Sequence, residues 1–350
     1  MKKLKVDQIA AANYPYYKYS LEYALESIQR IGADKMEFYA CYPHLHVDDA
    51  GISEVRAVKK QIKNHGLTPI CFTPEQCLYP VNIAAKDITA RKRSIDVYVK
   101  SMEFATELDI TLCQFLAGFG CLDEKDDDIW KRAAESVSYL ARIAEGYGIT
   151  IVLETSPKEF TVTDSSSNIL RMIEEVNSPA VQGMIDTATL GFSNETVEDQ
   201  IQRLGKHLYH VHIGDGVPNG HFAIGDGNLP LAHMMDELDK AGYTHYLSLE
   251  ILNDRYRRSP EEAMKKSTNE SDSEGKWMYL VGTQSADFLK DTIEEENTYD
   301  MPFIKGHYDD EHTFIGTMRV DFNRYPFDGN EIPQHFIWSL KINSILYPNV

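Results

Sequence analysis

Residues 181–215, VQGMIDTATLGFSNETVEDQIQRLGKHLYHVHIGD, predict one complete strand–helix–strand unit. The first six of these residues are mostly apolar and end on an acid, a pattern typical of a buried strand. A helical pattern follows at residues 197–204, and a second short apolar run follows at 208–213. Strands that alternate with helices predict a parallel sheet, because a helix must carry the chain back between parallel neighbours.

The same alternation extends in both directions, from the N-terminus to about residue 265. The expected strands are Val6–Ala11, Lys35–Ala40, Thr68–Phe72, Thr111–Leu116, Thr150–Glu154, Val181–Asp186, Leu208–Ile213 and Tyr246–Ile251. The expected helices are Ser20–Ile31, Ile52–Asn64, Ala90–Leu108, Asp126–Tyr147, Ser165–Val176, Val197–Leu204 and Leu229–Ala241. Eight such units predict an α/β fold, a (β/α)₈ TIM barrel. The alternative, an open doubly wound sheet, normally has a glycine-rich phosphate-binding turn after its first strand, and none is present here.

The chain changes character after the barrel pattern ends. We expect residues 1–266 to form the barrel and the polar stretch STNESDSEG, residues 267–275, to be a linker or exposed loop. Residues 276–350 are then expected to form a β-rich C-terminal extension. Within it, residues 318–322 alternate apolar and charged side chains, and residues 335–342 are also strand-like. Such an extension either caps the barrel, forms a subunit interface, or is a decoration without a role in the activity.

Composition narrows the class of protein. The length of 350 residues suits a barrel of about 250 residues with an extension. The net charge of -19 repels polyanions at long range, so we expect no nucleic-acid partner. The five cysteines are odd in number and form no CxxC pair, which argues against a disulfide framework or structural zinc. Without a signal peptide or a membrane-length apolar run, we expect a cytoplasmic protein with no membrane partner.

Four of the expected strands end on a side chain that can bind a metal: Glu154, Asp186, His212 and Glu250. The C-terminal ends of barrel strands meet at one mouth, so these four groups are expected to converge. Singly, each has an ordinary explanation as a solvated or core residue. Together, however, buried carboxylates need a counter-charge, and a divalent cation supplies one. Three carboxylates and one imidazole suit Mn²⁺, or alternatively Mg²⁺ or Co²⁺.

Other candidates surround these four. Asp215 and His221 lie in the loop after the seventh strand and are candidates for contact with a substrate, or with a further metal in the case of His221. His210 shares a strand face with His212 and is expected one layer deeper, behind the metal ligands. Arg255 follows the eighth strand and is placed to close over the mouth. The alternatives are an ordinary loop histidine at 221 and a surface arginine at 255.

Five segments resemble the xylose-isomerase-like barrel superfamily, and within it the ketose 3-epimerases and the fructoselysine 3-epimerase type. They are LETSPKEF (153–160), GMIDTATLGF (183–192), LGKHLYHVHIGDG (204–216), GHFAIGDGNLPL (220–231) and AGYTHYLSLEI (241–251). The resemblance spans roughly residues 5–265.

The resemblance implies a metal held by Glu154, Asp186, His212 and Glu250, and a substrate that is a sugar. It also implies that Glu154 and Glu250 are the catalytic acid and base on opposite faces of that sugar. The chemistry is consistent, because a metal that holds a carbonyl and a neighbouring hydroxyl acidifies the C–H between them. One carboxylate then removes this proton to give an enediolate, and the other returns it from the opposite face.

Two positions depart from the ketose 3-epimerase pattern. Those enzymes commonly have a histidine three residues after the acid of the sixth strand, where this chain has Thr189. They also have an arginine shortly after the histidine of the seventh strand, where this chain has Asp215-Gly216-Val217-Pro218. Both positions normally contact substrate. We therefore expect a larger or modified sugar in place of a plain ketose.

Three alternatives share the barrel. The first is the large subunit of a C-glycoside deglycosidase, a lyase that cleaves the C–C bond of 3-keto C-glycosides and pairs with a small β-rich partner subunit. Segments GHFAIGDGNLPL and NDRYRRSP (253–260) are compatible with it. The second, an apurinic-site endonuclease, needs more histidines and a basic face. The third, a non-catalytic sugar-binding barrel, would have degenerate ligands. We expect a small-molecule sugar or glycoside substrate and a homo-oligomer.

Overall fold

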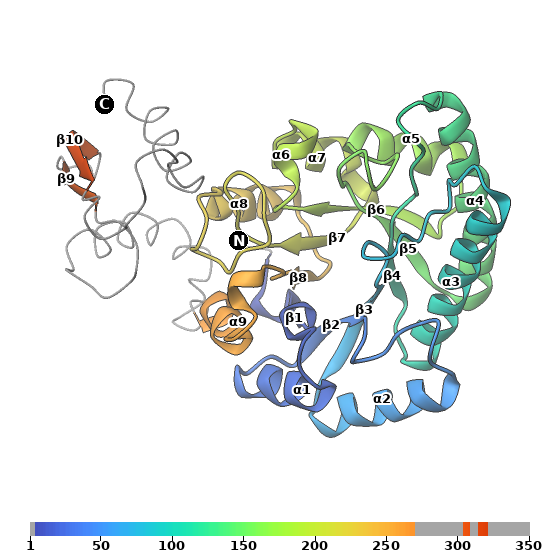
Figure 1. Cartoon of the computed structure of the whole chain (residues 1–350), viewed down its shortest axis with the longest axis horizontal. Coiled ribbons are helices and arrows are strands. Elements are labelled where there is room, and N and C mark those ends of the chain that lie inside the picture. Colours follow the sequence, from blue (N-terminus) through green and yellow to red (C-terminus); the bar gives the residue numbers. More distant parts are fainter. Residues whose placement is uncertain (1–3, 270–303, 309–313, 321–350) are drawn as a thin grey trace, which may run out of the picture. The chain divides into compact units, whose positions relative to one another are not determined.

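Eight parallel strands close into a barrel in the order β1 to β8, and β1 pairs with both β2 and β8 (Figure 1). The computed structural model describes residues 4–269, 304–308 and 314–320. The strands are β1 Ile9–Ala12, β2 Lys35–Ala40, β3 Thr68–Pro74, β4 Leu112–Phe115, β5 Thr150–Leu153, β6 Val181–Asp186, β7 Leu208–Ile213 and β8 Leu247–Leu249. The predicted (β/α)₈ barrel is therefore confirmed.

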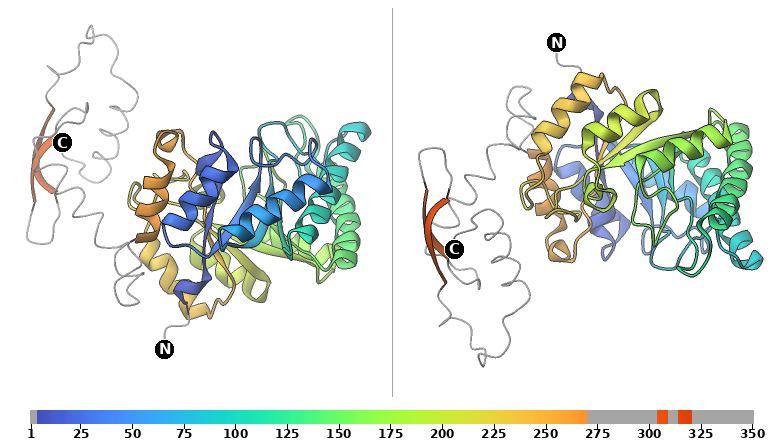
Figure 2. Two further views of the ribbon diagram at one scale, coloured as in Figure 1. Left: turned by 90° about the horizontal axis from the view of Figure 1, so that it is seen from below. Right: turned by 90° about the horizontal axis from the view of Figure 1, so that it is seen from above.

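Helices follow the strands and lie outside the barrel (Figure 2). They are α1 Leu21–Arg30, α2 Ile52–Asn64, α3 Ile88–Glu107, α4 Asp126–Tyr147, α5 Ser166–Val176, α6 Leu190–Ser193, α7 Val197–Leu204, α8 Leu231–Ala241 and α9 Pro260–Asn269. None of the helices in these described ranges is long and apolar enough to cross a membrane.

Local signals account for the helix ends. Helix α4 begins with three aspartates, which favour the positive end of the helix dipole, and it stops at Gly148 in the left-handed conformation, φ +67°. The side chain of Asp87 accepts a hydrogen bond from the Ala90 amide and starts α3 two residues earlier than the periodicity predicts. The first strand is also shorter than expected, because Val6–Gln8 form a 3₁₀ turn before β1.

Side chains that point into the barrel and side chains that point towards the helices form two separate layers, and strand β2 contributes to both. Met36 and Phe38 belong to the main hydrophobic core, where the Phe38 ring lies 6.1 Å from that of Phe72. Glu37, between them, reaches His210 and His212 on β7, which is not a neighbour of β2 in the sheet. Successive side chains of a strand alternate between faces, so Glu37 points into the barrel and its neighbours point towards the helices.

The chain after the barrel forms a second compact unit, Thr283–Val350. In this unit β9 Ile304–Tyr308 pairs antiparallel with β10 Phe314–Val320, which includes part of the strand expected near 318–322. The strand expected at 335–342 lies outside the described residues. The first three residues of the expected linker, Ser267–Asn269, are the end of helix α9, and the rest of it also lies outside them.

Candidate metal centre

The four predicted metal ligands all lie at the C-terminal ends of neighbouring strands. Glu154 directly follows β5, Asp186 ends β6, His212 is the last but one residue of β7, and Glu250 directly follows β8. All four are buried. The strand pairing brings them together, since Asp186 is the register partner of His212.

The structure gathers these side chains into two groups of three that share Glu250. The first contains Glu154, His212 and Glu250, and the second contains Asp186, His221 and Glu250. Within each group, one ligand atom per residue lies within 4.8 Å of the others. His221 thus joins the four predicted residues, with its Nε2 3.1 Å from Asp186 Oδ2 and 3.5 Å from Glu250 Oε2.

The residues present fit a divalent cation. Nδ1 of His212 lies 2.7 Å from Oε2 of Glu250 and 3.6 Å from Oε1 of Glu154. Nδ1 of His212 and Oε2 of Glu250 are both buried, and among the described residues neither has a partner with hydrogen-bond geometry. Three carboxylates in one buried space repel one another, and a cation between the oxygens and the nitrogen removes that cost. Oxygen and imidazole ligands of this kind suit Mn²⁺ and related ions.

The electrostatics of the metal-free site follow from burial and crowding. Burial raises the pKa of Glu154 to about 7, and the charges of Glu250 and Asp186 add to this effect. Burial also acts to raise the pKa of Asp186, but the imidazoles of His221 and His212 and the Ala188 amide together outweigh it, and the pKa is lowered. The same carboxylates raise the pKa of His221 to about 10 against the opposing effect of its burial.

A chain of hydrogen bonds that we did not predict holds Glu154. The Tyr98 hydroxyl donates to Gln76 Oε1 at 2.5 Å, and Gln76 Nε2 donates to Gln114 Oε1 at 2.5 Å. Gln114 Nε2 then donates to Glu154 Oε2 at 2.6 Å. The signal in the sequence was a glutamine inside the apolar strand LCQF, which must find buried partners.

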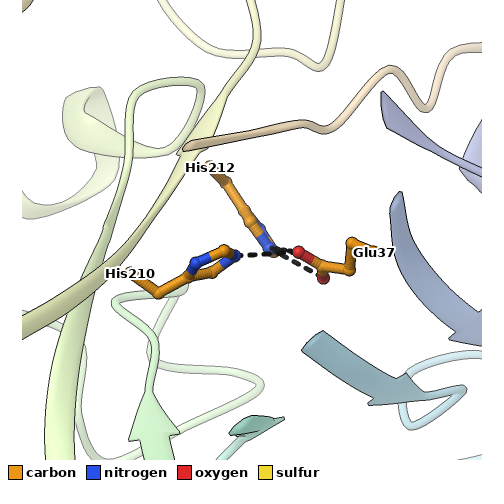
Figure 3. A group of neighbouring side chains, drawn as sticks. All are labelled: Glu37, His210 and His212. Carbon is orange, nitrogen blue, oxygen red and sulfur yellow. Dashed lines mark hydrogen bonds and ion pairs between the residues drawn. The ribbon is translucent and has the colours of Figure 1, made fainter. Parts of the chain in front are cut away.

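Glu37, a buried acid on β2, also lies at this site although the sequence did not predict it there. Its carboxylate contacts Nε2 of both His210 and His212 (Figure 3) and is fully buried. An acid inside the apolar strand KMEFYA was the available signal. His210 contacts the same carboxylate, with its Nε2 2.8 Å from Glu37 Oε2, and its place behind the metal ligands stays a prediction.

The carboxylate of Asp215 faces the backbone of its own loop. It accepts hydrogen bonds from the amides of Gly216, Gly225, Gly227 and Leu229. Gly227 is required there, because a Cβ would lie 2.3 Å from Asp215 Oδ1. The Asp215 oxygens therefore organise the loop that carries His221.

Two further candidates for substrate contact have protein partners of their own. The buried Thr189 hydroxyl donates to the carbonyl oxygens of Thr155 and Asp186. The exposed Arg255 guanidinium lies 3.9 Å from the centre of the Phe222 ring. Substrate contact stays a prediction for both residues, as it does for Asp215.

Comparison with known proteins is consistent with this geometry. The family model described as "Xylose isomerase-like TIM barrel" matches residues 25–272. Fructoselysine 3-epimerase of Escherichia coli O157:H7 is 28% identical over 235 residues, which are 66% of this chain and 86% of that protein. D-psicose 3-epimerase of Ruminiclostridium cellulolyticum is 24% identical over 68% of this chain and 78% of that protein. The fold of a 3-keto-D-glucoside 4-epimerase from E. coli is similar, with a TM-score of 0.64 and 17% identity, over 78% of this chain and 99% of that one.

Proposed function

The chain belongs to the xylose isomerase-like TIM barrel family, and we propose that it is a divalent-metal-dependent sugar isomerase or epimerase. The observation that carries the proposal is a pair of buried atoms 2.7 Å apart, His212 Nδ1 and Glu250 Oε2, which form no hydrogen bond with any described residue and have Glu154 beside them. Two neighbouring glutamates can act as general acid and general base, and an imidazole beside them can hold a metal ion that binds the substrate.

The four predicted ligands have two different roles. Asp186 and His212 anchor the ion, while Glu154 and Glu250 both bind it and exchange protons with the sugar. When bound, Mn²⁺, Mg²⁺ or Co²⁺ polarises a carbonyl and a neighbouring hydroxyl, which acidifies the C–H between them. One glutamate removes this proton to leave an enediolate, and the other delivers a proton to the opposite face. The pKa of Glu154, about 7 without metal, suits a group that both accepts and donates protons near neutrality.

The substrate is a sugar that is larger than a plain ketose or carries a modification. This is supported by Thr189, which occupies the position where ketose 3-epimerases commonly have a histidine. Its hydroxyl donates to the carbonyl oxygens of Thr155, just after β5, and Asp186, the last residue of β6. A homo-oligomer, a cytoplasmic location and a role for residues 276–350 at a subunit interface stay predictions. Light scattering of the full chain tests the first of these.

The decisive experiment follows deuterium in a metal-loaded enzyme. The Mn²⁺-loaded protein is incubated in D₂O with candidate sugars. These include free ketoses and ketoses linked to an amino acid. We expect one carbon-bound deuterium to appear with a sugar isomer, and Glu154→Gln and Glu250→Gln to abolish the exchange. The matched control is Glu135→Gln on the exposed face of α4, which should exchange normally.

Two results would overturn the proposal. One is a purified protein that contains no metal and gains no stability from Mn²⁺. The other is release of an aglycone from a 3-keto C-glycoside without formation of a sugar isomer, which would identify a carbon–carbon lyase.

A further inference from the structure

Glu37 is an acid in an unusual place. It lies on β2, which is three strands away from β7 around the closed barrel, and none of its side-chain surface is exposed. Its carboxylate accepts hydrogen bonds from four groups of three other segments: the hydroxyls of Tyr14 and Thr73, at 2.9 and 2.6 Å, and Nε2 of both His210 and His212. A buried carboxylate needs this degree of satisfaction to remain ionised.

The contact with His212 is the one with chemical consequences. Nε2 of His212 lies 2.9 Å from Oε1 and 3.0 Å from Oε2 of Glu37. An ionised carboxylate only accepts hydrogen bonds, so the proton must be on Nε2. In the neutral imidazole that a metal requires, the lone pair is then on Nδ1. Nδ1 is also the atom that faces Glu154 and Glu250.

We propose that Glu37 is the positioning residue of the metal centre, which fixes the tautomer and ring orientation of His212 so that Nδ1 binds the cation. This inference rests on the proposed metal-dependent function. The carboxylate also makes the bound imidazole a stronger ligand, because its charge stabilises the N–H on the far side of the ring. Glu37 itself stays outside the coordination sphere, and Tyr14, Thr73 and His210 hold its carboxylate in place (Figure 3).

The first test compares Mn²⁺ affinity across three full-length proteins. Metal is removed with a chelator and Mn²⁺ is titrated back, with free Mn²⁺ followed by electron paramagnetic resonance. Glu37→Gln keeps the shape but loses the charge, and we expect its Mn²⁺ affinity to fall about 10- to 100-fold. Ser136→Ala is the matched control, because it removes a buried hydrogen bond, from the Ser136 hydroxyl to the Ile83 carbonyl, that involves neither Glu37 nor a proposed ligand. Its affinity should stay within about threefold of the unaltered protein.

A structural role alone predicts a different pattern. If Glu37 only stabilised the fold, Glu37→Gln would lower the melting temperature of the metal-free protein. The increase in melting temperature that a fixed subsaturating concentration of Mn²⁺ produces would then be unchanged. We expect the reverse: a metal-free melting temperature close to that of Ser136→Ala and a smaller increase on addition of Mn²⁺ at that same concentration.

A second measurement needs no change at Glu37. In the Mg²⁺-loaded protein labelled with ¹⁵N-histidine, the His212 signals, identified by their loss in His212→Gln, should show a proton on Nε2 and none on Nδ1. A proton on Nδ1 would overturn the proposal.

The titration separates this inference from the proposed function. Glu37, His210 and His212 also lie close enough together to hold an ion of their own. Two Mn²⁺ per chain, one of them lost in Glu37→Gln, would make Glu37 a ligand and overturn the positioning role. One Mn²⁺ bound equally well by Glu37→Gln would overturn it too, with the metal-dependent function intact. No Mn²⁺ bound by the unaltered protein would contradict the proposed function itself.

Discussion

Gln114 Nε2 donates a hydrogen bond to Oε2 of Glu154 at 2.6 Å, and this contact distinguishes the two proposed catalytic glutamates. It ties one oxygen of Glu154 to β4 and leaves Oε1 on the side of His212. Glu250 lacks such support, since its Oε2 has no hydrogen-bond partner among the described residues. One carboxylate is thus held by the protein, and the other is left for the metal and the substrate.

Replacing Gln114 by Leu should shift the pH dependence of catalysis. Without the amide donor the charged form of Glu154 is less stable, so its pKa rises further above the ordinary value. We expect the pH profile of deuterium exchange to move upwards by on the order of one unit, with the rate at neutral pH lowered about tenfold. The control is Gln182→Met at the start of β6. This variant also removes a glutamine amide, but one that donates to the Pro179 carbonyl and does not contact Glu154. An unshifted profile in Gln114→Leu would show that this contact does not tune Glu154.

Removing Glu250 should weaken metal binding more than removing Asp186, because only Glu250 belongs to both groups of ligands. For Glu250→Gln we expect at least a 100-fold loss of Mn²⁺ affinity, and for Asp186→Asn a smaller loss, on the order of tenfold. Metal content by mass spectrometry and calorimetric titration give the two values. The opposite order would mean that the ion is centred on β6 and not on Glu250.

Mn²⁺ affinity should depend on pH through Glu154. Its pKa in the metal-free protein is raised to about 7, and only the ionised carboxylate binds a cation. Below pH 7 a proton must leave Glu154 when the ion binds, so this group should make the affinity fall by about tenfold per unit as the pH drops. The imidazoles of His212 and His221, whose pKa values the neighbouring carboxylates raise against the effect of burial, add their own dependence above pH 7. Titrations at several pH values in Glu154→Gln provide the control, since this variant should lose that part of the slope. A slope unchanged in Glu154→Gln would assign the proton to another group.

The conformation of the loop after β7, and with it the stability of the protein, should depend on the Asp215 carboxylate. This carboxylate accepts four backbone N–H groups, and hydrogen bonds to a charged acceptor contribute about 1.5–3 kcal/mol each. Asp215→Asn replaces one acceptor oxygen by a donor, so we expect a loss of about 2–4 kcal/mol in the free energy of unfolding. Denaturant unfolding of the metal-free protein measures this loss. A change below 0.5 kcal/mol, the usual range for surface substitutions, would show that the loop keeps its form without the carboxylate.

The sequence by itself determined the barrel and the places, at the strand ends, of the four residues that we propose as metal ligands. Both depend on local order along the chain: short apolar runs alternate with helical patterns, and Glu154, Asp186, His212 and Glu250 each stand at the end of such a run. Closure of parallel strands then brings those ends to one mouth without further information. The alternation of side chains along a strand likewise predicted that His210 and His212 share a face of β7, and both contact Glu37.

Only the tertiary structure decided what surrounds these ligands. Glu37 meets His212 across 175 residues of chain, and Gln114 meets Glu154 across 40. Asp215 turned towards its own backbone, whereas His221, in the same loop, turned towards Asp186. The periodicity of a strand tells which face a side chain occupies, but the contact it makes across the barrel depends on strand tilt, register and loop conformation. Those are set by the packing of the whole barrel, so the residues that surround the proposed metal ligands can be identified only in the closed barrel.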